Sequence, residues 1–426
     1  MPSQCGNSVL WDAGERMDGE PIELDDALGA VLARATPLED EDVALREALG
    51  RWLAEDVVAG APVQGFDNSA MDGFAVRAAD TAAARPGSPV ALEVAGESRA
   101  GHPASDALGA GQAIAISTGA MLPAGADAVV RVEDTERRGD RVLVEAGVAA
   151  GLDVRRAGED IAAGETVLAR GVRIGPAQLG VLASVGRDAV RCHRRPRVAV
   201  VTSGDELKMP GEPLAPGEVR NSNSYSVPAL AALAGAEVCS VAWTPDEPEA
   251  TRAAVEAGLD ADVTLVCGGV SVGEHDHVKD VFDRLGVERA FWRVALRPGG
   301  PTWFGTRGDT LVFGLPGNPV SAMVTFTLLA RPALVALGGG RRRRQRTFAT
   351  LASDLEKRPG RAHAVRCRLE LTEDGWRAHP APHQGSHVLT SMLGADCLAL
   401  IPARSGDVRA GERVEIELLD GASMAS

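Results

Sequence analysis

Residues 310–326 read TLVFGLPGNPVSAMVTF, and this stretch decides the class of fold. An apolar run typical of a buried strand leads into a rigid turn, after which apolar residues recur at helical spacing (Val320, Met323, Val324, Leu328). Asn318 suits the N-cap of that helix, and Pro319 suits its first position, where a missing N–H has no partner to lose. Gly317 would let backbone N–H groups approach a ligand, and the helix start favours an anion. An ordinary strand–helix turn explains the same residues equally well.

Three further apolar runs share this design: RVAVVTSG (197–204), EVCSVAW (237–243) and DVTLVCGG (262–269). Helices are expected between and after the runs, at 224–234, 246–258, 278–285 and 319–336. Strands that alternate with helices predict a doubly wound α/β domain with a parallel sheet and right-handed crossovers. Ligands of such sheets bind at the carboxyl ends of the strands, so we expect the functional site at that edge.

The rest of the sequence predicts more than one further domain. Short β-like runs (VALEV, AIAIS, AVVRV, RVLVE) indicate a β-rich insertion, and an expected helix at 22–34 with helical character near Pro176 indicates a domain split by it. After a basic hinge, GGGRRRRQR, the C-terminal runs indicate a small all-β domain. The expected boundaries are 1–20 for a disordered start, 21–60 with 148–192 for the split domain, 61–147 for the insertion, 193–338 for the α/β domain and 339–426 for the C-terminal domain.

The composition argues against several classes of protein. A net charge of −15 disfavours a nucleic-acid-binding surface, because such a surface needs basic patches. The six cysteines include no C-x-x-C pair, so neither a zinc ribbon nor a disulfide framework is indicated. We see neither a secretory leader nor an apolar stretch of about 18 residues, and expect a cytoplasmic protein without a membrane partner. The pattern G-x-x-x-x-G-K-[ST] is missing, which disfavours a P-loop NTPase.

Acidic residues follow two of the predicted strands, in TSGDEL (202–207) and CGGVSVGEHDH (267–277). Because the carboxyl ends of parallel strands meet at one edge, these carboxylates are expected to face a common crevice. Carboxylates beside phosphate-binding loops suit Mg²⁺, which takes oxygen ligands and bridges to substrate phosphates. Each carboxylate taken singly is better explained as a surface or capping residue, and their shared position favours the metal site. The predicted magnesium set is Asp205, Glu206, Glu274 and Asp276.

A different chemistry competes inside the second loop. Residues 269–273 match the G-x-S-x-G turn of serine hydrolases, with Ser271 as the nucleophile. No HGGG-like oxyanion segment is present, and Glu274 and Asp276 would oppose a developing oxyanion. His275 and His277 lack the further ligands of a zinc site. A serine hydrolase remains the alternative, and Ser271→Ala would distinguish a nucleophile from a loop serine.

The segment FWRVALRPGGPTWFG (291–305) places Arg293 and Arg297 on one face of either a helix or an extended strand. Guanidinium groups bind phosphate and other oxyanions bidentately, but two surface arginines are the simpler explanation in a chain this rich in arginine. In GFDNSAMDGFAVR (65–77), Asp67 and Asp72 lie in a short polar turn that an Asx turn would explain in part.

Longer motifs cover nearly the whole chain in order: GFDNSAMDGFAVR, ISTGAMLPAGADAVVRVED, DVRRAGEDI, VTSGDEL, RNSNSYSVPAL, CGGVSVGEHDH, FWRVALRPGGP, FGLPGNPVSAMVTF and QGSHVLTSMLGADCL. Together they resemble the molybdopterin molybdenumtransferases, the MoeA family related to the E domain of gephyrin. The resemblance implies a split dimerisation domain, a β-rich insertion, an α/β domain and a C-terminal β-barrel. The α/β domain would be similar to MogA, which is a molybdopterin adenylyltransferase. It also implies a homodimer whose cleft combines the α/β and barrel domains of one subunit with the insertion of the other.

The reaction implied by the resemblance inserts molybdenum from molybdate into adenylylated molybdopterin, with Mg²⁺-dependent loss of AMP. A molybdopterin adenylyltransferase is then a candidate partner. By motif position, the catalytic residues would be Asp67, Glu206, Asp246 and Asp276. The substrate-binding residues would be Thr118, Asp160, Gly268, Gly269, Ser271, Arg293, Arg297, Pro316, Gly317, Asn318, Arg361 and Ser386.

The chain departs from the family at three basic positions. The family usually has lysine where this chain has Arg293, Arg297 and Gly300. The two arginines keep the positive charge of the family's lysines and fit a chain with 41 arginines and three lysines. Glycine at position 300 does not carry that charge. A different metal preference, such as tungsten, and a scaffold relative without turnover are the further alternatives.

Overall fold

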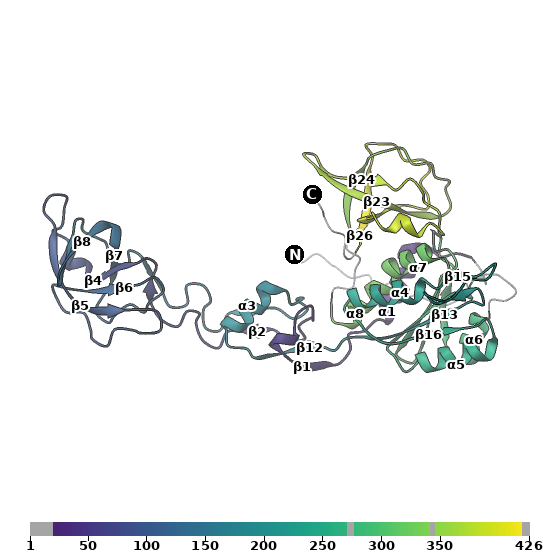
Figure 1. The fold of residues 1–426 in the computed structure, drawn as a ribbon, viewed down its shortest axis with the longest axis horizontal. Coiled ribbons are helices and arrows are strands. Elements are labelled where there is room, and N and C mark those ends of the chain that lie inside the picture. Colours follow the sequence, from purple (N-terminus) through teal and green to yellow (C-terminus); the bar gives the residue numbers. More distant parts are fainter. Residues whose placement is uncertain (1–19, 271–276, 341–345, 420–426) are drawn as a thin grey trace, which may run out of the picture. The chain divides into compact units, whose positions relative to one another are not determined.

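The computed structural model describes residues 20–270, 277–340 and 346–419. The chain forms two compact units (Figure 1). Unit 1 consists of Met1–Asp42, Gly50–Ala54 and Arg191–Ser426, and unit 2 of Val43–Leu49 and Glu55–Val190. The chain passes between the units within β1 (Asp40–Ala44), at residues 49–50 and 54–55, and within β12 (Ala189–His193), and η1 (Leu45–Glu47) belongs to unit 2.

A six-stranded sheet with the order β16-β13-β17-β21-β20-β18 forms the centre of unit 1. Its four parallel strands are the four predicted runs, namely β13 (Arg197–Ser203), β16 (Glu237–Thr244), β17 (Val263–Cys267) and β21 (Thr310–Leu315). The predicted parallel sheet is confirmed for these four strands, and two strands that were not predicted, β20 (Trp303–Arg307) and β18 (Glu288–Trp292), extend it with antiparallel pairing. Gly308, with a φ of 57°, closes the β20–β21 hairpin, and a connection this short permits only antiparallel pairing.

Helices cover both faces of this sheet (Figure 1). On one face lie α1 (Leu24–Arg34), α4 (Asn223–Leu233) and the helix at 319–337, and on the other α5 (Pro248–Gly258) and α6 (Val278–Arg284). Successive strand residues point to opposite faces, so Val200 packs in the first core and Val201 in the second. The predicted helices are confirmed to within a few residues. Helix α1 belongs to this core although we assigned residues 21–60 to the split domain, and the other domain boundaries stay predictions.

The helix at 319–337 is apolar all round. It consists of α7 (Pro319–Thr325), a π-helical stretch η3 (Phe326–Ala330) and α8 (Arg331–Leu337). Its mean hydropathy of 1.7 would suit a membrane-crossing helix, but 89% of the apolar window is buried inside the protein. The expectation that no such apolar stretch exists is therefore wrong, because a helix enclosed by a core needs no polar face.

The C-terminal part of unit 1 is a closed five-stranded barrel. Its strands are β22 (Arg346–Leu351), β23 (Ala362–Thr372), β24 (Gly375–Pro380), β25 (Cys397–Ile401) and β26 (Arg413–Leu418), with the short helix η4 (Leu389–Met392) between β24 and β25. The ring β23-β24-β22-β26 closes through β25, which pairs with both β26 and β23. A further strand, β19 (Leu296–Arg297), joins β23 in parallel and links the barrel to the α/β part. The predicted barrel is confirmed.

Unit 2 contains a second six-stranded sheet with the order β7-β4-β6-β5-β9-β8. Its strands are β4 (Gly73–Val76), β5 (Val90–Ser98), β6 (Gln112–Ile116), β7 (Ala128–Arg131), β8 (Thr135–Arg138) and β9 (Arg141–Val144). The four β-like runs of this region are confirmed as strands. The remaining elements of the unit are α2 (Ala78–Thr81), η2 (Val132–Asp134), α3 (Pro176–Ser184) and the pairs β2 (Val57–Val58) with β11 (Thr166–Leu168) and β3 (Asn68–Ser69) with β10 (Val154–Arg155).

Candidate functional site

The four parallel strands of unit 1 end level with one another. Ser203, at the end of β13, is in register with Thr244, at the end of β16. Cys267, at the end of β17, is in register with Thr202 of β13 and with Leu315 at the end of β21. The loops that follow these strands therefore start at one edge of the sheet, as the sequence predicts.

Glycine is required where β17 ends. Gly268 has a φ of 104°, and a Cβ there would lie 2.5 Å from the carbonyl oxygen of Ser203. Gly269 has a φ of 64°, and its Cβ would lie 2.5 Å from a methyl group of Val278. A Cβ on Gly317, in the turn after β21, would come within 3.6 Å of the Gly268 Cα. The two loops thus lie backbone to backbone, as in glycine loops that bind phosphate, and the Gly268 N–H is itself bonded to the Leu315 carbonyl oxygen at 3.0 Å.

Two carboxylates are held at neighbouring positions beyond β13 and β16. Ser203 Oγ donates to Asp246 Oδ1 at 2.5 Å, and the Asp246 N–H donates to Asp205 Oδ1 at 3.0 Å. Glu206 is exposed, and its carbonyl oxygen accepts the Val219 N–H at 2.8 Å. That bond continues as the small ladder between β14 (Leu207–Lys208) and β15 (Val219–Arg220), which anchors the acidic loop.

The described residues contain no group of three or more His, Cys, Asp or Glu side chains placed to hold a metal ion. Glu274 and Asp276 of the predicted magnesium set lie outside the described residues, as does Ser271. Asp205 and Asp246 offer hard oxygen donors, and Mg²⁺ takes few protein ligands when substrate phosphates and water supply the rest. The pair therefore fits Mg²⁺ as a partner of phosphate.

The turn at 316–318 connects the α/β core to the barrel. The helix begins at Pro319 as predicted, but the Asn318 side chain makes no capping hydrogen bond. Its Nδ2 donates instead to Ser386 Oγ at 3.3 Å. Ser386 lies in a loop that Gln384 fastens to β23 by two hydrogen bonds of 3.0 Å with the backbone of Arg366. Asn318 thus occupies the predicted N-cap position, but its amide is turned towards the barrel and does not bond the helix.

A buried asparagine that we did not single out holds the same turn. Asn223 is 7% exposed, and its Nδ2 donates to the Gly317 carbonyl oxygen at 2.8 Å. Its Oδ1 is buried and has no hydrogen-bond partner among the described residues. An unpaired buried acceptor is costly unless a ligand supplies the donor. The polar run RNSNSYS at 220–226, which opens a buried helix, is the signal that could have identified it.

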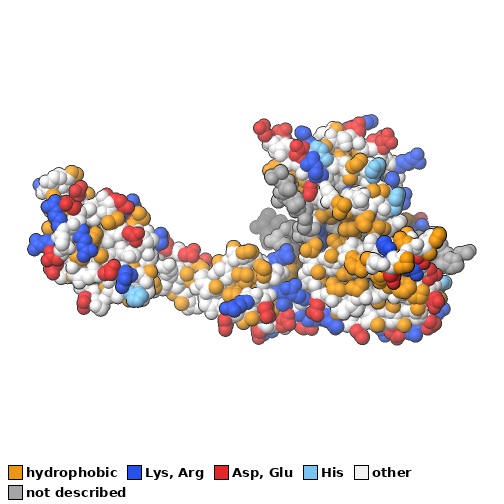
Figure 2. Space-filling model, in the orientation of Figure 1, with side chains coloured by type: hydrophobic (Ala, Val, Ile, Leu, Met, Phe, Trp, Pro, Cys, Tyr) orange, Lys and Arg blue, Asp and Glu red, His pale blue; other side chains and the backbone are white. Residues whose placement is uncertain are grey.

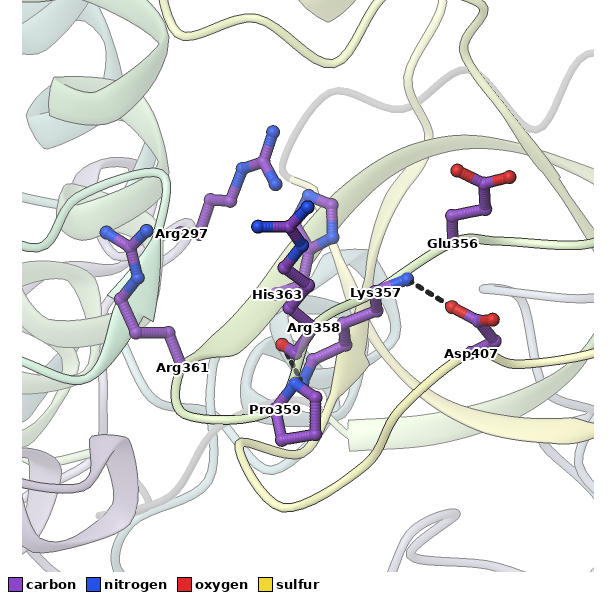
Figure 3. A pocket seen from close by; sticks show the side chains of 8 residues that line it. All are labelled: Arg297, Glu356, Lys357, Arg358, Pro359, Arg361, His363 and Asp407. Atoms are coloured by element: carbon purple, nitrogen blue, oxygen red, sulfur yellow. Dashed lines mark hydrogen bonds between the residues drawn. The ribbon is translucent and has the colours of Figure 1, made fainter.

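A pocket of about 540 Å³ lies where β19 pairs with β23 (Figure 3). Its lining consists of Arg297, Glu356, Lys357, Arg358, Pro359, Arg361, His363 and Asp407. It therefore brings together two of the predicted anion-binding residues, Arg297 and Arg361. Within the described part of the chain, neither of them has an ion pair or a side-chain hydrogen bond. Four cations against two carboxylates make the lining electropositive, and the volume suits a small-molecule ligand.

Arg293 and Ser386 are not part of this lining. Arg293 has a left-handed backbone, with a φ of 73°, and its guanidinium carbon lies 5.5 Å from the centre of the Trp292 ring. The prediction that Arg293 and Arg297 share one regular face is wrong, because no helix or strand passes through a left-handed residue. A Cβ on Gly300 would find its nearest neighbour at 3.5 Å, so a side chain fits at this position.

Two buried basic residues of the pocket were not predicted. The Lys357 Nζ donates to the carbonyl oxygens of Arg358, Ala403 and Ser405, at 3.3, 3.2 and 2.7 Å, and burial lowers the pKa of Lys357. His363 is 4% exposed. Burial, with the positive charges of Arg297, Arg366 and Lys357, lowers the pKa of His363 to about 4, so the imidazole is neutral at pH 7.

Asp67 and Asp160 of unit 2 lie in or beside one bonded loop. Asp67 Oδ2 accepts from Arg156 Nη1 at 2.6 Å, and Asp67 Oδ1 accepts from the Ala157 N–H at 2.8 Å. The Ala157 N–H and the Arg156 guanidinium hold the pKa of Asp67 below its usual value. Asp160 follows in the same loop and is exposed.

Thr118 is bonded to the polar turn that contains Asp72. Its N–H and its Oγ1 both donate to Asp72 Oδ1, at 2.7 and 3.1 Å. Ser69 exchanges local hydrogen bonds with the backbone of Met71. A local turn therefore accounts for Ser69, whereas Asp67 and Asp72 bind segments far away in the sequence.

Comparisons with known proteins cover nearly the whole chain. Family models match at residues 22–186, the MoeA N-terminal region (domain I and II), at residues 199–336, a probable molybdopterin binding domain, and at residues 349–419, the MoeA C-terminal region (domain IV). A molybdopterin molybdenumtransferase of Haemophilus influenzae is 36% identical over 402 residues, which cover 93% of this chain and 98% of that protein. One from Bacillus subtilis is 36% identical over 405 residues, covering 94% of each.

A solved structure agrees in fold as well as in sequence. The molybdopterin biosynthesis MoeA protein from Pyrococcus horikosii matches with a TM-score of 0.78 and 34% identity, over 94% of this chain and 99% of that one. The motifs, the doubly wound sheet and the closed barrel all agree with these relatives. The chain thus belongs to the MoeA family of molybdopterin molybdenumtransferases and is a transferase of molybdenum cofactor biosynthesis.

Proposed function

We propose that this protein inserts molybdenum from molybdate into the dithiolene of adenylylated molybdopterin and releases AMP, with Mg²⁺ as its cofactor. One observation carries the proposal: glycine loops packed backbone to backbone at Gly268 and Gly317 lie at the same sheet edge as the carboxylates of Asp205 and Asp246. This arrangement suits a metal-bridged pyrophosphate. In the reaction two Mo–S bonds form, one molybdate oxygen leaves as water with the two thiol protons, and water cleaves the phosphoanhydride.

The residues of unit 1 take three roles in this proposal. The backbone of the Gly268–Gly269 loop and of the turn at 316–318 binds the phosphates and the pterin, and Asn223 holds that turn in place. Glu206 and Asp246, with Asp205, hold Mg²⁺, which when bound neutralises phosphate charge. Arg297 and Arg361 bind molybdate in the barrel pocket. Arg293 and Ser386 bind substrate outside that pocket, and Ser271 and Asp276, assigned by motif alone, complete the set.

We further propose a cytoplasmic homodimer in which Asp67, Thr118 and Asp160 of one subunit complete the site of the other. The support for this comes from the family resemblance. A molybdopterin adenylyltransferase would supply the adenylylated substrate. Sedimentation equilibrium tests the dimer: we expect twice the 44.2 kDa chain mass, and a monomer at micromolar concentration would contradict it.

The reaction is tested with purified protein, adenylylated molybdopterin, Mg²⁺ and molybdate, by chromatography of AMP and assay of active cofactor. We expect AMP release that depends on molybdate, and a loss of at least about tenfold in D246N. D260N is the matched control, because Asp260 is exposed and precedes β17 at the opposite edge of the sheet.

The same assay separates the alternatives. AMP release with tungstate but not with molybdate would show that the protein inserts tungsten. No AMP release with either oxyanion would favour a scaffold protein without turnover. A serine hydrolase would lose nearly all of its activity in S271A, whereas we expect a modest loss of AMP release from a loop serine.

A further inference from the structure

The barrel pocket contains an imidazole that the proposed reaction does not use. His363 is 4% exposed, and neither Nδ1 nor Nε2 has a hydrogen-bond partner among the described residues. Buried polar groups are nearly always paired in folded proteins, so an unpaired pair of ring nitrogens needs an explanation. His363 lines the pocket, with both ring nitrogens buried (Figure 3).

The pairing of strands explains how the imidazole comes to lie among arginines. His363 of β23 is in parallel register with Arg297 of β19, so the two side chains leave the sheet on the same side. Arg361 lies just before β23, two residues from His363, and lines the same pocket. Figure 3 shows the head groups of Arg297 and Arg358 extending to the same end of the pocket as the imidazole.

The positive charges around His363 outnumber the carboxylates of the described pocket lining. Arg366, fully buried on the other side of β23, bonds only neutral oxygens, those of Ser391, Ala364 and Gly385. Of the two acids in the lining, Asp407 accepts the Lys357 N–H at 2.8 Å, and Glu356 is exposed. Four cations against two carboxylates leave an excess of positive charge in the pocket, which favours the entry of an anion. The missing partner of His363 is therefore best sought on an anionic ligand.

A neutral imidazole carries one N–H donor and one acceptor nitrogen. Molybdate and tungstate, fully deprotonated at neutral pH, present only acceptor oxygens. A donor at the buried end of the pocket complements such an anion in a way that the exposed guanidinium groups alone do not. Hydrogen bonds to charged groups are the stronger ones, and they fix direction as well as distance.

We propose that His363 is an oxyanion-binding residue, whose imidazole N–H donates to an oxygen of the tetrahedral anion held between Arg297 and Arg361. The inference rests on the proposed function, which places molybdate in this pocket. It adds a residue that sets both affinity and orientation of the anion, so that a non-hydrogen-bonding side chain at 363 weakens binding without changing the charge of the pocket.

The test uses the full chain and tungstate alone, by titration calorimetry at pH 7.5. For H363L we expect affinity to fall about tenfold, which is about 1.4 kcal/mol. H363Q keeps an amide N–H donor and is expected to lose less than about threefold. R361A reports on the pocket itself and is expected to lose at least about tenfold. H379Q is the matched control, since His379 belongs to the same barrel but is bonded to Glu370 at 2.6 Å.

A second readout follows the imidazole of the wild-type protein and needs no core substitution. In NMR spectra of protein with labelled histidine, we expect tungstate to shift the His363 ring signals and leave those of His379 in place. Wild-type binding lost in R361A but unchanged in H363L, with no shift at His363, would overturn the histidine assignment and leave the pocket intact. Absence of tungstate binding to the wild-type protein, or full binding in R361A, would overturn the pocket and the histidine together.

Discussion

Alanine at Gly268 tests how tightly the loop after β17 is built. The new Cβ would lie 2.5 Å from the Ser203 carbonyl oxygen, in a backbone conformation with a φ of 104°. Left-handed backbone costs a non-glycine residue about 1–2 kcal/mol. Moving the loop away from Ser203 also weakens the bond from the Gly268 N–H to the Leu315 carbonyl oxygen, worth about 1 kcal/mol. We therefore expect G268A to lower the free energy of unfolding of unit 1 by about 3 kcal/mol.

The matched control is G300A. Gly300 does not have a left-handed backbone, and its Cβ would meet nothing closer than 3.5 Å, so we expect a change below about 1 kcal/mol. The assay is differential scanning calorimetry of the full chain, with hydrogen exchange of the peptide that covers 263–270. A loss of 3 kcal/mol in a unit of this size lowers its Tm by roughly 5 °C. A G268A protein that melts within a degree of both wild type and G300A, with unchanged exchange, would refute the reasoning.

Three further outcomes follow from the geometry. Arg331 and Glu417 form a buried ion pair between α8 and β26. In urea denaturation, R331M should lower the free energy of unfolding by about 3–5 kcal/mol, because it leaves the Glu417 charge buried without its partner. The double variant R331M/E417L should have a free energy of unfolding close to that of the wild type. The pKa of His363 in the folded protein, about 4, lies below its ordinary value of 6.5, so the unfolded chain takes up the proton first as pH falls. The free energy of unfolding should therefore drop by about 2 kcal/mol between pH 7.5 and pH 5. H363Q should lack this drop in thermal melts at the two pH values. A Cβ at Gly300 meets nothing closer than 3.5 Å, and a lysine there adds a cation, so G300K should bind tungstate a few-fold more tightly in calorimetry at low salt. An unchanged affinity would separate this position from the anion site.

Periodicity and turn chemistry predict most of the α/β fold. Strands β13, β17 and β21 are continuous apolar runs, because a parallel strand is buried on both faces. Runs of five to seven residues between turns are too short for helices, which favours strands. Helix α1 shows what such patterns leave open: its apolar face predicts burial but does not say against which partner, and the structure packs it on the α/β core. Strands β18 and β20 were missed because their five-residue segments, ERAFW and WFGTR, group charged and aromatic residues and show no period-2 alternation.

The site is only partly accessible to sequence reasoning. Gly268 and Asp205 could be predicted, because strand ends in a doubly wound sheet share one edge. His363 could not, since its significance depends on the register that places it beside Arg297, and register between distant segments is a tertiary property. Asn318 illustrates the same limit: its local preference is to cap a helix, and a contact with Ser386 overrides that preference.

The central claim is that the glycine loops and carboxylates at the ends of β13, β17 and β21 hold the pyrophosphate of the substrate. A crystal structure of the protein with adenylylated molybdopterin and Mg²⁺ tests this most directly. The account predicts phosphate oxygens within hydrogen-bond distance of the backbone N–H groups of Gly269, Gly317 and Asn318, with the metal beside Asp205 and Asp246. A well-ordered ligand bound away from these strand ends would contradict it.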